Sequence, residues 1–189
     1  MNKRFLKLLL VKLGIDLYLK SPDRDLLEGT ILPWLASQPS SDRVLFVGCD
    51  WYTHGYRKWF KPDSYWTLDY DPDKALFGSR RLHITDSVAR LSDHFKAGSL
   101  DLIICNGVFG WGLDKREDIE AAFAAVAQAL RPGGLFLFGW NDVPEHRPVA
   151  LADIQALSAL RPHVIAPCGV SQLLTSSELR HTFSLFARP

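Results

Sequence analysis

Residues 100–138 read LDLIICNGVFGWGLDKREDIEAAFAAVAQALRPGGLFLF, and this stretch decides the fold. It begins with an apolar run that predicts a buried strand. Asp114 and Glu117 then have the spacing of a capping box, and apolar residues at helical spacing follow them. The Arg-Pro-Gly-Gly sequence at 131–134 ends the predicted helix, and a second apolar run follows it. The stretch therefore predicts a strand, a helix and a second strand, which is the repeating unit of a parallel sheet.

The rest of the chain continues this alternation. Further strands are expected at the apolar runs 43–47, 64–68, 82–84 and 181–187. Further helices are expected over 3–13, 23–38 (with Pro33 bending or ending the helix), 53–60, 88–95 and 150–160. Apolar strands that alternate with helices are typical of an α/β fold with helices on both faces of a parallel sheet. We divide the chain into an N-terminal helical segment, 1–40, and one domain, 41–189.

The composition is that of an ordinary globular domain. The chain has 189 residues, of which 47% are hydrophobic and 23% are charged. These values exclude a disordered or low-complexity protein, and no apolar run approaches the ~18 residues that a membrane span needs. The formal net charge is +1, so no general basic field indicates a nucleic-acid partner.

The charge is nevertheless unevenly distributed. Residues 1–20 hold five basic side chains and one acidic side chain, a net charge of +4, and the remainder of the chain has −3. This basic, leucine-rich start imitates a secretory signal, but Lys7 and Lys12 interrupt the apolar run and no small-x-small cleavage site follows. Three widely spaced cysteines form neither a disulfide framework nor a zinc motif, so we expect a cytoplasmic protein without a metal.

Sheets of this kind bind ligands beyond the carboxyl ends of their strands, where two acidic residues stand. Asp69 ends the second predicted strand, and its carboxylate can accept hydrogen bonds from both hydroxyls of a ribose; the alternative is a turn or capping residue before Pro72. Asp86 ends the third strand. It can accept a hydrogen bond from an adenine amino group, or it can cap the helix that begins at Val88.

The turn after the first strand restricts the nucleotide. It contains Gly48, but the G-x-G-x-x-G fingerprint of dinucleotide-binding enzymes is missing, and Asp50 would repel a phosphate. The sequence has no P-loop motif either. The turn therefore disfavours a nicotinamide oxidoreductase and is compatible with a ligand that contains adenosine without phosphate.

Two histidines and two aromatic residues fall in predicted site loops. His54 and His146 are candidate general bases, and the alternative is that each is an ordinary loop residue. Trp51 and Tyr52 lie in the turn after the first strand, where an aromatic ring can stack on a base or surround a sulfonium; such residues are otherwise part of the core.

The motifs occur in an order that matches one family: Val44–Asp50, Thr67–Asp71, Ile84–Ser87, Leu100–Gly107 and Leu130–Gly134. On these motifs the chain resembles the class I S-adenosylmethionine-dependent methyltransferases over about residues 42–188. The resemblance implies a Rossmann-like, doubly wound α/β fold. Its sheet would be mostly parallel and seven-stranded, with an antiparallel C-terminal strand at 180–187. The implied cofactor is S-adenosyl-L-methionine.

The resemblance also implies roles for residues at the strand ends. It places the methionine part of the cofactor near Gly48 and Gly107, the ribose hydroxyls on Asp69 and the adenine amine on Asp86. The full set of expected cofactor-binding residues is Gly48, Cys49, Asp50, Asp69, Tyr70, Asp86, Ser87, Asn106 and Gly107. The residues expected near the methyl acceptor are Trp111, Trp140 and Asn141.

The first motif departs from the family pattern. The acid that usually stands two residues before the first glycine, and helps to hold the methionine ammonium, is replaced by Phe46. Asp50 and Tyr52 replace two further glycines, and Asp50 is a candidate for the missing negative charge. Asn106-Gly107-Val108-Phe109 lacks the Pro-Pro element of enzymes that methylate nucleic-acid bases. We therefore expect a methyltransferase that acts on an oxygen or nitrogen of a small molecule. The alternative is a catalytically inactive methyltransferase-like binding or scaffold protein.

The basic segment 1–20 has two interpretations. It can pack on the domain as an amphipathic helix that covers the cofactor site, or it can rest on an anionic membrane surface as a peripheral contact, within reach of a lipid-linked acceptor. The first 40 residues and the loop at 141–148 are the expected lid of the site.

Overall fold

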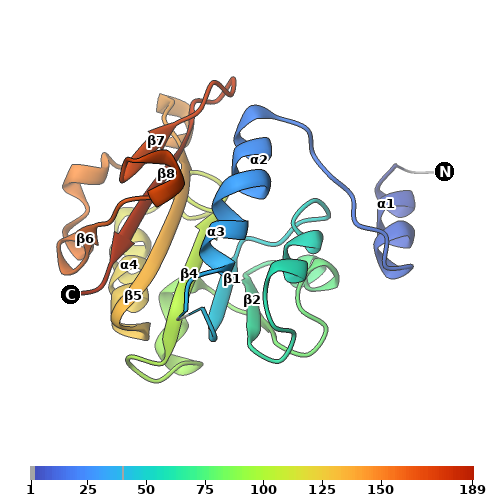
Figure 1. Cartoon of the computed structure of the whole chain (residues 1–189), viewed down its shortest axis with the longest axis horizontal. Coiled ribbons are helices and arrows are strands. Elements are labelled where there is room, and N and C mark those ends of the chain that lie inside the picture. The colour runs from blue at the N-terminus through green and yellow to red at the C-terminus, as the bar shows by residue number, and fades with distance from the viewer. Residues whose placement is uncertain (1–2, 40) are drawn as a thin grey trace.

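The computed structural model describes residues 3–39 and 41–189; Met1, Asn2 and Ser40, all within the expected N-terminal segment, lie outside the described residues. One sheet with helices on both faces dominates the described chain (Figure 1). Its strands are β1 (Val44–Val47), β2 (Tyr65–Asp69), β3 (His83–Thr85), β4 (Leu100–Asn106), β5 (Leu130–Asn141), β6 (Arg161–Pro162), β7 (Gln172–Leu174) and β8 (His181–Ala187). Their order is β3-β2-β1-β4-β5-β8-β6, and β7 pairs with β8 outside this path.

The strand directions confirm the expected fold class. Strands β1 to β5 pair in parallel, whereas β8 runs antiparallel to β5, from Leu135 opposite Ala187 to Asn141 opposite His181. The two shortest strands, β6 and β7, are both antiparallel to β8. The sheet is therefore Rossmann-like and mostly parallel at its centre; the path holds the seven strands expected, and β7 adds an eighth.

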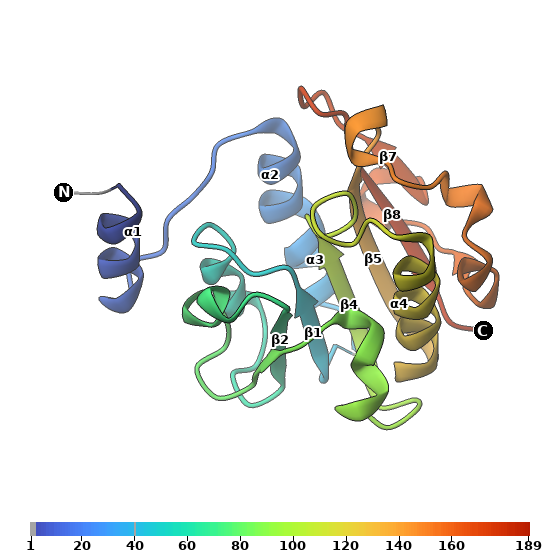
Figure 2. The ribbon, with the colours of Figure 1, turned by 180° about the vertical axis from the view of Figure 1, so that it is seen from behind.

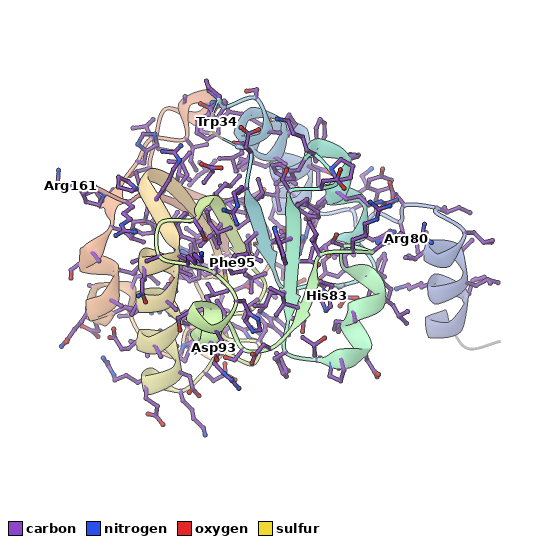
Figure 3. The ribbon with its side chains drawn as sticks, turned by 90° about the horizontal axis from the view of Figure 1, so that it is seen from below. Trp34, Arg80, His83, Asp93, Phe95 and Arg161 are labelled. Carbon is purple, nitrogen blue, oxygen red and sulfur yellow. The ribbon has the colours of Figure 1, made fainter. Side chains whose placement is uncertain are left out.

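Over residues 3–39 and 41–189, four α-helices accompany the sheet: α1 (Lys3–Lys12), α2 (Pro22–Leu26), α3 (Leu32–Ala36) and α4 (Arg116–Ala129). Leu27, Ile31 and Leu35, from α3 and the turn before it, are fully buried on one face of the sheet. The other face is covered by α4, which buries Ile119 and Phe123 (Figure 2). Figure 3 shows the two layers, with Trp34 on one side of the sheet and Phe95 on the other.

The helix expected over 23–38 is one helical segment with an irregular centre. A π-helical turn, Leu27–Ile31, joins α2 to α3, and Pro33 lies in the first turn of α3. Proline lacks the N–H that a continuous α-helix would need there, and the wider turn before it accommodates the missing hydrogen bond. Pro33 thus neither ends nor breaks the segment.

The expected capping box at the start of α4 is wrong. Lys115 is the N-cap residue, with an extended backbone, and no side chain caps the helix. Asp114 therefore stands one residue too early to reach the third helical N–H. Glu117 and Asp118 lie in the first turn instead, where their charges favour the positive end of the helix dipole.

Three other expected helices are 3-10 turns. The helix expected over 53–60 is the turn His54–Trp59, which contains Gly55, a poor helix former. The helix expected over 88–95 is the turn Val88–Asp93, interrupted by the non-helical backbone of Arg90. The helix expected near 150–160 is split at the extended residue Ile154 into two short turns. The remaining 3-10 turns are Pro72–Phe77, Pro144–His146 and Ala166–Cys168.

Helix α1 lies at the side of the molecule, joined to α2 by an extended segment (Figures 1 and 2). One face of it packs on the domain, since Val11 is buried and the Lys7 Nζ lies 3.5 Å from the centroid of the Trp51 ring. No helix in the described part of the chain is long and apolar enough to span a membrane.

Candidate functional site

The strand order creates a crevice where two crossovers diverge. β1 lies between β2 and β4, and the chain leaves these strands in opposite directions, which is the point where ligands bind in open α/β sheets. Gly48 follows β1 there with a φ of +96°, and an added Cβ would lie 2.6 Å from the carbonyl oxygen of Asn106. Only glycine fits this position, because the end of β4 approaches the turn closely.

A pocket of about 810 Å³ lies at this edge of the sheet. Its volume falls in the range of small-molecule sites. Of the residues expected in the site, those that line the pocket are Gly48, Cys49, Asp50, Asp69, Tyr70, Asp86, Ser87, Gly107, Trp111 and Asn141. The other walls come from segments far apart in the chain: Leu19–Arg24 in part, Lys74, and Ser177–His181 in part.

Asp69 joins the ends of two strands at the bottom of the pocket. Its Oδ2 accepts a hydrogen bond from the Cys49 backbone N–H at 2.7 Å, and its Oδ1 accepts one from the Asp71 N–H at 3.0 Å. Burial raises the pKa of the Asp69 carboxyl, and these two N–H groups oppose the rise. Each carboxylate oxygen has a second acceptor position, so Asp69 can still accept two hydrogen bonds from a ligand. The capping role is filled by Asp71, whose side chain caps Pro72–Phe77.

Asp86 has protein partners on both oxygens. Its Oδ2 lies 2.8 Å from the His94 Nε2, and its Oδ1 accepts from the Ser87 N–H at 2.8 Å. The hydrogen bond with His94, aided by the Ser87 N–H, lowers the pKa of the Asp86 carboxyl. The alternative role as helix cap belongs to its neighbour, because the Ser87 Oγ accepts from the Ala89 N–H. Asp86 is therefore an oriented, ionised acceptor beside the pocket.

The charge of Asp50 is already compensated. Lys74 Nζ donates to the Asp50 Oδ2 at 2.7 Å, and Asp50 Oδ1 accepts from the Trp51 N–H at 2.6 Å. Burial acts to lower the pKa of Lys74, but the Asp50 carboxylate outweighs it and the pKa is raised. Asp50 thus forms an ion pair in the wall of the pocket.

Cys49 and Cys105 are free, buried thiols. They belong to the hydrophobic clusters on opposite faces of the sheet. Burial raises the pKa of the Cys49 thiol above its usual range and that of Cys105 to about 12. Both are protonated core side chains, and in the part of the chain that is described no group of three His, Cys, Asp or Glu could hold a metal ion.

Two expected site residues turn away from the pocket. Trp140 is 5% exposed and donates from Nε1 to the Ser184 Oγ, because strand alternation directs it into the core on the α4 side while Asn141 faces the pocket. Asn106 is 2% exposed, and its Oδ1 accepts from His181 Nε2 at 2.9 Å. Asn106 therefore orients His181, which lines the pocket, and does not itself line it.

The two expected general bases also lie outside the pocket lining. His54 Nδ1 is 3.2 Å from the Phe77 carbonyl oxygen, and burial lowers its pKa. His146 stacks on Trp111, with ring centroids 3.9 Å apart, and its Nδ1 is 3.0 Å from the Gly110 oxygen. His146 supports Trp111, whose Nε1 donates to the Asn141 Oδ1 at 3.2 Å.

Sequence reasoning missed several pocket residues, among them Asp23, Arg24, Lys74 and His181. His181 is the first residue of an apolar strand, and Arg24 lies in a helix without a motif. Their positions in the pocket follow from packing between segments that are far apart in the sequence, so no local pattern indicates them. The one available signal for His181 was a histidine at the start of the apolar run 181–187.

Comparison with known proteins agrees with this architecture. Residues 47–138, just under half of the chain, match the family model of a methyltransferase domain. No curated protein matches the sequence. Among solved structures, the N-methyltransferase NodS from Bradyrhizobium japonicum WM9 is 18% identical over 88% of this chain and 96% of its own, with a TM-score of 0.66. NodS has also been crystallised with S-adenosylhomocysteine.

Two further structures have the same fold. A TehB-like S-adenosylmethionine-dependent methyltransferase from Corynebacterium glutamicum ATCC 13032 Kitasato is 16% identical over 99% of this chain and 95% of its own, with a TM-score of 0.61. The geranyl diphosphate C-methyltransferase from Streptomyces coelicolor A3(2) is 13% identical over 88% and 80%, also with a TM-score of 0.61. A 16S rRNA N2 G1207 methyltransferase, RsmC from T. thermophilus, shares the fold as well.

The fold and the strand-end pocket define a class of Rossmann-like transferases that bind an adenosine-containing cofactor. Within it, residues 47–138 match a methyltransferase domain, and the fold is that of S-adenosylmethionine-dependent methyltransferases. The pocket fits this cofactor: Asp69 retains acceptor capacity for a ribose, Gly48 leaves room beside β4, and no phosphate-binding loop is present.

Proposed function

We propose that this methyltransferase acts on an oxygen or nitrogen atom of a small molecule. The observation that carries the proposal is the charge of the pocket: seven acidic and two basic side chains line it. The two basic ones, Arg24 and Lys74, contact protein groups. A nucleic-acid site needs a row of exposed cationic side chains along a phosphate backbone, and two basic side chains among seven acidic ones do not form such a row. A neutral or cationic small acceptor suits it.

We assign cofactor binding to the strand-end residues that line the pocket. Asp69 would hold the ribose hydroxyls and Asp86 the adenine amine, with Tyr70, Ser87, Gly48, Cys49 and Gly107 around them. S-adenosylmethionine, when bound, supplies a methyl group activated by a positively charged sulfur. The protein contributes mainly by holding the acceptor in line with that group and by excluding water.

His181 is our candidate for the proton acceptor, in place of His54 and His146. It is the one histidine among the described residues that lines the pocket. Because the Asn106 Oδ1 can only accept, its contact with Nε2 requires the proton on that nitrogen and leaves Nδ1 with a lone pair. Nδ1 can then take the proton that an O–H or N–H acceptor loses.

Asp69→Asn should weaken the binding of S-adenosylhomocysteine in calorimetry by about 1–3 kcal/mol, because a ligand hydroxyl would meet an amide in place of a carboxylate. The exposed Asp63→Asn, just before the same strand, is the control and should bind as the wild type does. Equal affinity of the two variants would contradict the assignment of Asp69.

Transfer itself is tested with S-adenosylmethionine labelled in the methyl group. We expect label in the low-molecular-mass fraction of a cell extract, none in purified RNA, and a product methyl group whose NMR shift is that of an O- or N-methyl. Label in RNA or on carbon would contradict the acceptor class. Cofactor binding without any transfer would favour the inactive binding protein.

A further inference from the structure

Phe46 leaves the methionine ammonium without its usual acidic partner. The Phe46 side chain is 1% exposed and packs edge-on against Tyr56, with ring centroids 5.4 Å apart. The nearby acid in the following turn, Asp50, is paired with Lys74. An unpaired negative charge for an ammonium at this end of the pocket would therefore come from another element.

Helix α2 brings two adjacent opposite charges to the pocket wall. Asp23 and Arg24 both line the pocket, and their side chains are 13% and 8% exposed. Arg24 Nη1 donates to the Tyr56 Oη at 2.7 Å, and the guanidinium lies 4.4 Å from the centroid of the Tyr52 ring. Tyr56 and Tyr52 therefore hold Arg24 in one orientation.

Arg24 is buried without a hydrogen-bonded carboxylate. Its closest carboxylate oxygen, on Asp23, is 3.7 Å from Nε, which is beyond hydrogen-bond distance. Within the described part of the chain, Tyr56 is its one hydrogen-bond partner. A buried guanidinium that keeps most of its donors unused favours an anionic ligand, and its planar fork matches a carboxylate.

We infer that Asp23 and Arg24 form a receptor for an amino-acid zwitterion, the methionine part of the cofactor. Arg24 binds the α-carboxylate, and Asp23 accepts hydrogen bonds from the α-ammonium. The acid missing at Phe46 is thereby replaced from α2, and Phe46 serves this arrangement by supporting Tyr56. The inference rests on S-adenosylmethionine being the cofactor, and the measurements below separate the two.

The test compares S-adenosylhomocysteine with 5′-methylthioadenosine, which has the same nucleoside and thioether but no amino-acid group. In calorimetry, Arg24→Gln and Asp23→Asn should each bind S-adenosylhomocysteine about tenfold or more weakly than the wild type does, the usual loss for a hydrogen bond to a charged group. Their affinity for 5′-methylthioadenosine should not change. Asp25→Asn, on the exposed side of the same helix, is the matched control and should bind both as the wild type does.

The wild-type protein gives an independent measurement that needs no variant. Decarboxylated S-adenosylhomocysteine should bind at least about tenfold more weakly than the intact compound, because Arg24 loses its partner. Equal binding would overturn the inference, as would variants that lose affinity for both nucleosides equally or for neither. If the wild type bound 5′-methylthioadenosine but Asp23 and Arg24 proved irrelevant, the cofactor assignment would stand and this inference would fall. Binding of neither nucleoside would overturn both.

Discussion

Gly48 shows how one position makes the pocket possible. Its φ of +96° lies in the region that side chains disfavour, and an added Cβ would meet the Asn106 oxygen at 2.6 Å and the Val108 Cγ2 at 2.7 Å. The turn after β1 and the end of β4 can approach each other because this residue has no side chain.

We therefore expect Gly48→Ala to lower the free energy of unfolding by more than about 1 kcal/mol in urea denaturation, since alanine is incompatible with the native conformation. Gly29→Ala is the matched control. Gly29 lies in the helical segment with open space around it, so alanine there should raise stability by about 0.5–1 kcal/mol. A neutral effect at both positions would contradict this account of Gly48.

His181 makes stability depend on pH. Burial lowers its pKa to about 4, and the nearby Asp23 and Arg24 act in opposite directions on it. Between this value and the ~6.5 of an unfolded histidine, the unfolded state binds more protons, so stability is full above ~6.5 and is lost as the pH falls toward 4.

His181→Gln should therefore lose less stability than the wild type between neutral pH and pH ~4 in chemical denaturation. His54 and His83 also have lowered pKa values, but they are present in both proteins and their contributions cancel in the comparison. Parallel stability curves for the two proteins across this window would show that His181 does not titrate as stated.

Among the elements, α1 bears on both interpretations of the basic segment 1–20, packing on the domain and contact with an anionic membrane. Its inner face packs on the domain through Val11 and Lys7, but none of the α1 side chains that the structure describes lines the large pocket; Leu19 and Ser21, which follow the helix, do. In the described part of the chain, the segment that follows α1 borders the pocket, and the role of α1 itself as a cover stays a prediction.

Exposed apolar side chains remain on and just after α1, where Leu6, Leu9 and Leu13 are 39%, 42% and 68% exposed. Together with the net charge of +4 in residues 1–20, they suit an anionic bilayer. We expect the full chain to co-sediment with vesicles that contain phosphatidylglycerol, and the combined variant Leu6→Ser, Leu9→Ser, Leu13→Ser to stay in the supernatant.

Leu174→Ser, which removes a similarly exposed leucine on β7, is the control and should sediment with the vesicles. Neutral phosphatidylcholine vesicles should bind the full chain less, because the electrostatic part of the attraction is missing. Equal sedimentation of the triple variant and the wild type would remove the membrane interpretation.

In the whole molecule, two segments that are far apart in the sequence line the same pocket. Segments near Leu19–Arg24 and Ser177–His181 both contribute to its walls, whereas the loop at 141–148, also expected in the lid, contributes Asn141 alone. A ligand that orders these two segments should protect their backbone amides from hydrogen exchange.

S-adenosylhomocysteine should therefore slow hydrogen exchange in 19–24 and 177–181 as well as in the turn after β1. The 3-10 turn at Gln155–Ala159, which lies outside the pocket lining, is the internal control and should not change. Protection confined to the strand ends would show that the two segments do not close on the cofactor.

Much of this architecture could be predicted from the amino-acid sequence. Apolar runs and helix-breaking residues predicted the central strands to within a few residues. The strand ends also predicted Asp69 and Asp86 as site residues. Both signals are local in the chain. The failures have local causes too: Lys115 in place of Asp114 at the start of α4, and 3-10 turns where Gly55, Arg90 and Ile154 interrupt helices.

The amino-acid order alone thus predicted the alternation of strands and helices and the acids at the strand ends, since periodicity and spacing encode them. The class of cofactor was implied by the resemblance of the motifs to a known family. The folded arrangement alone established that Trp140 faces the core, that Asp50 is neutralised by Lys74, and that α2 and β8 bring Arg24 and His181 to one pocket. These are contacts between distant segments. They depend on how every layer packs against the sheet, and no spacing within the chain records them.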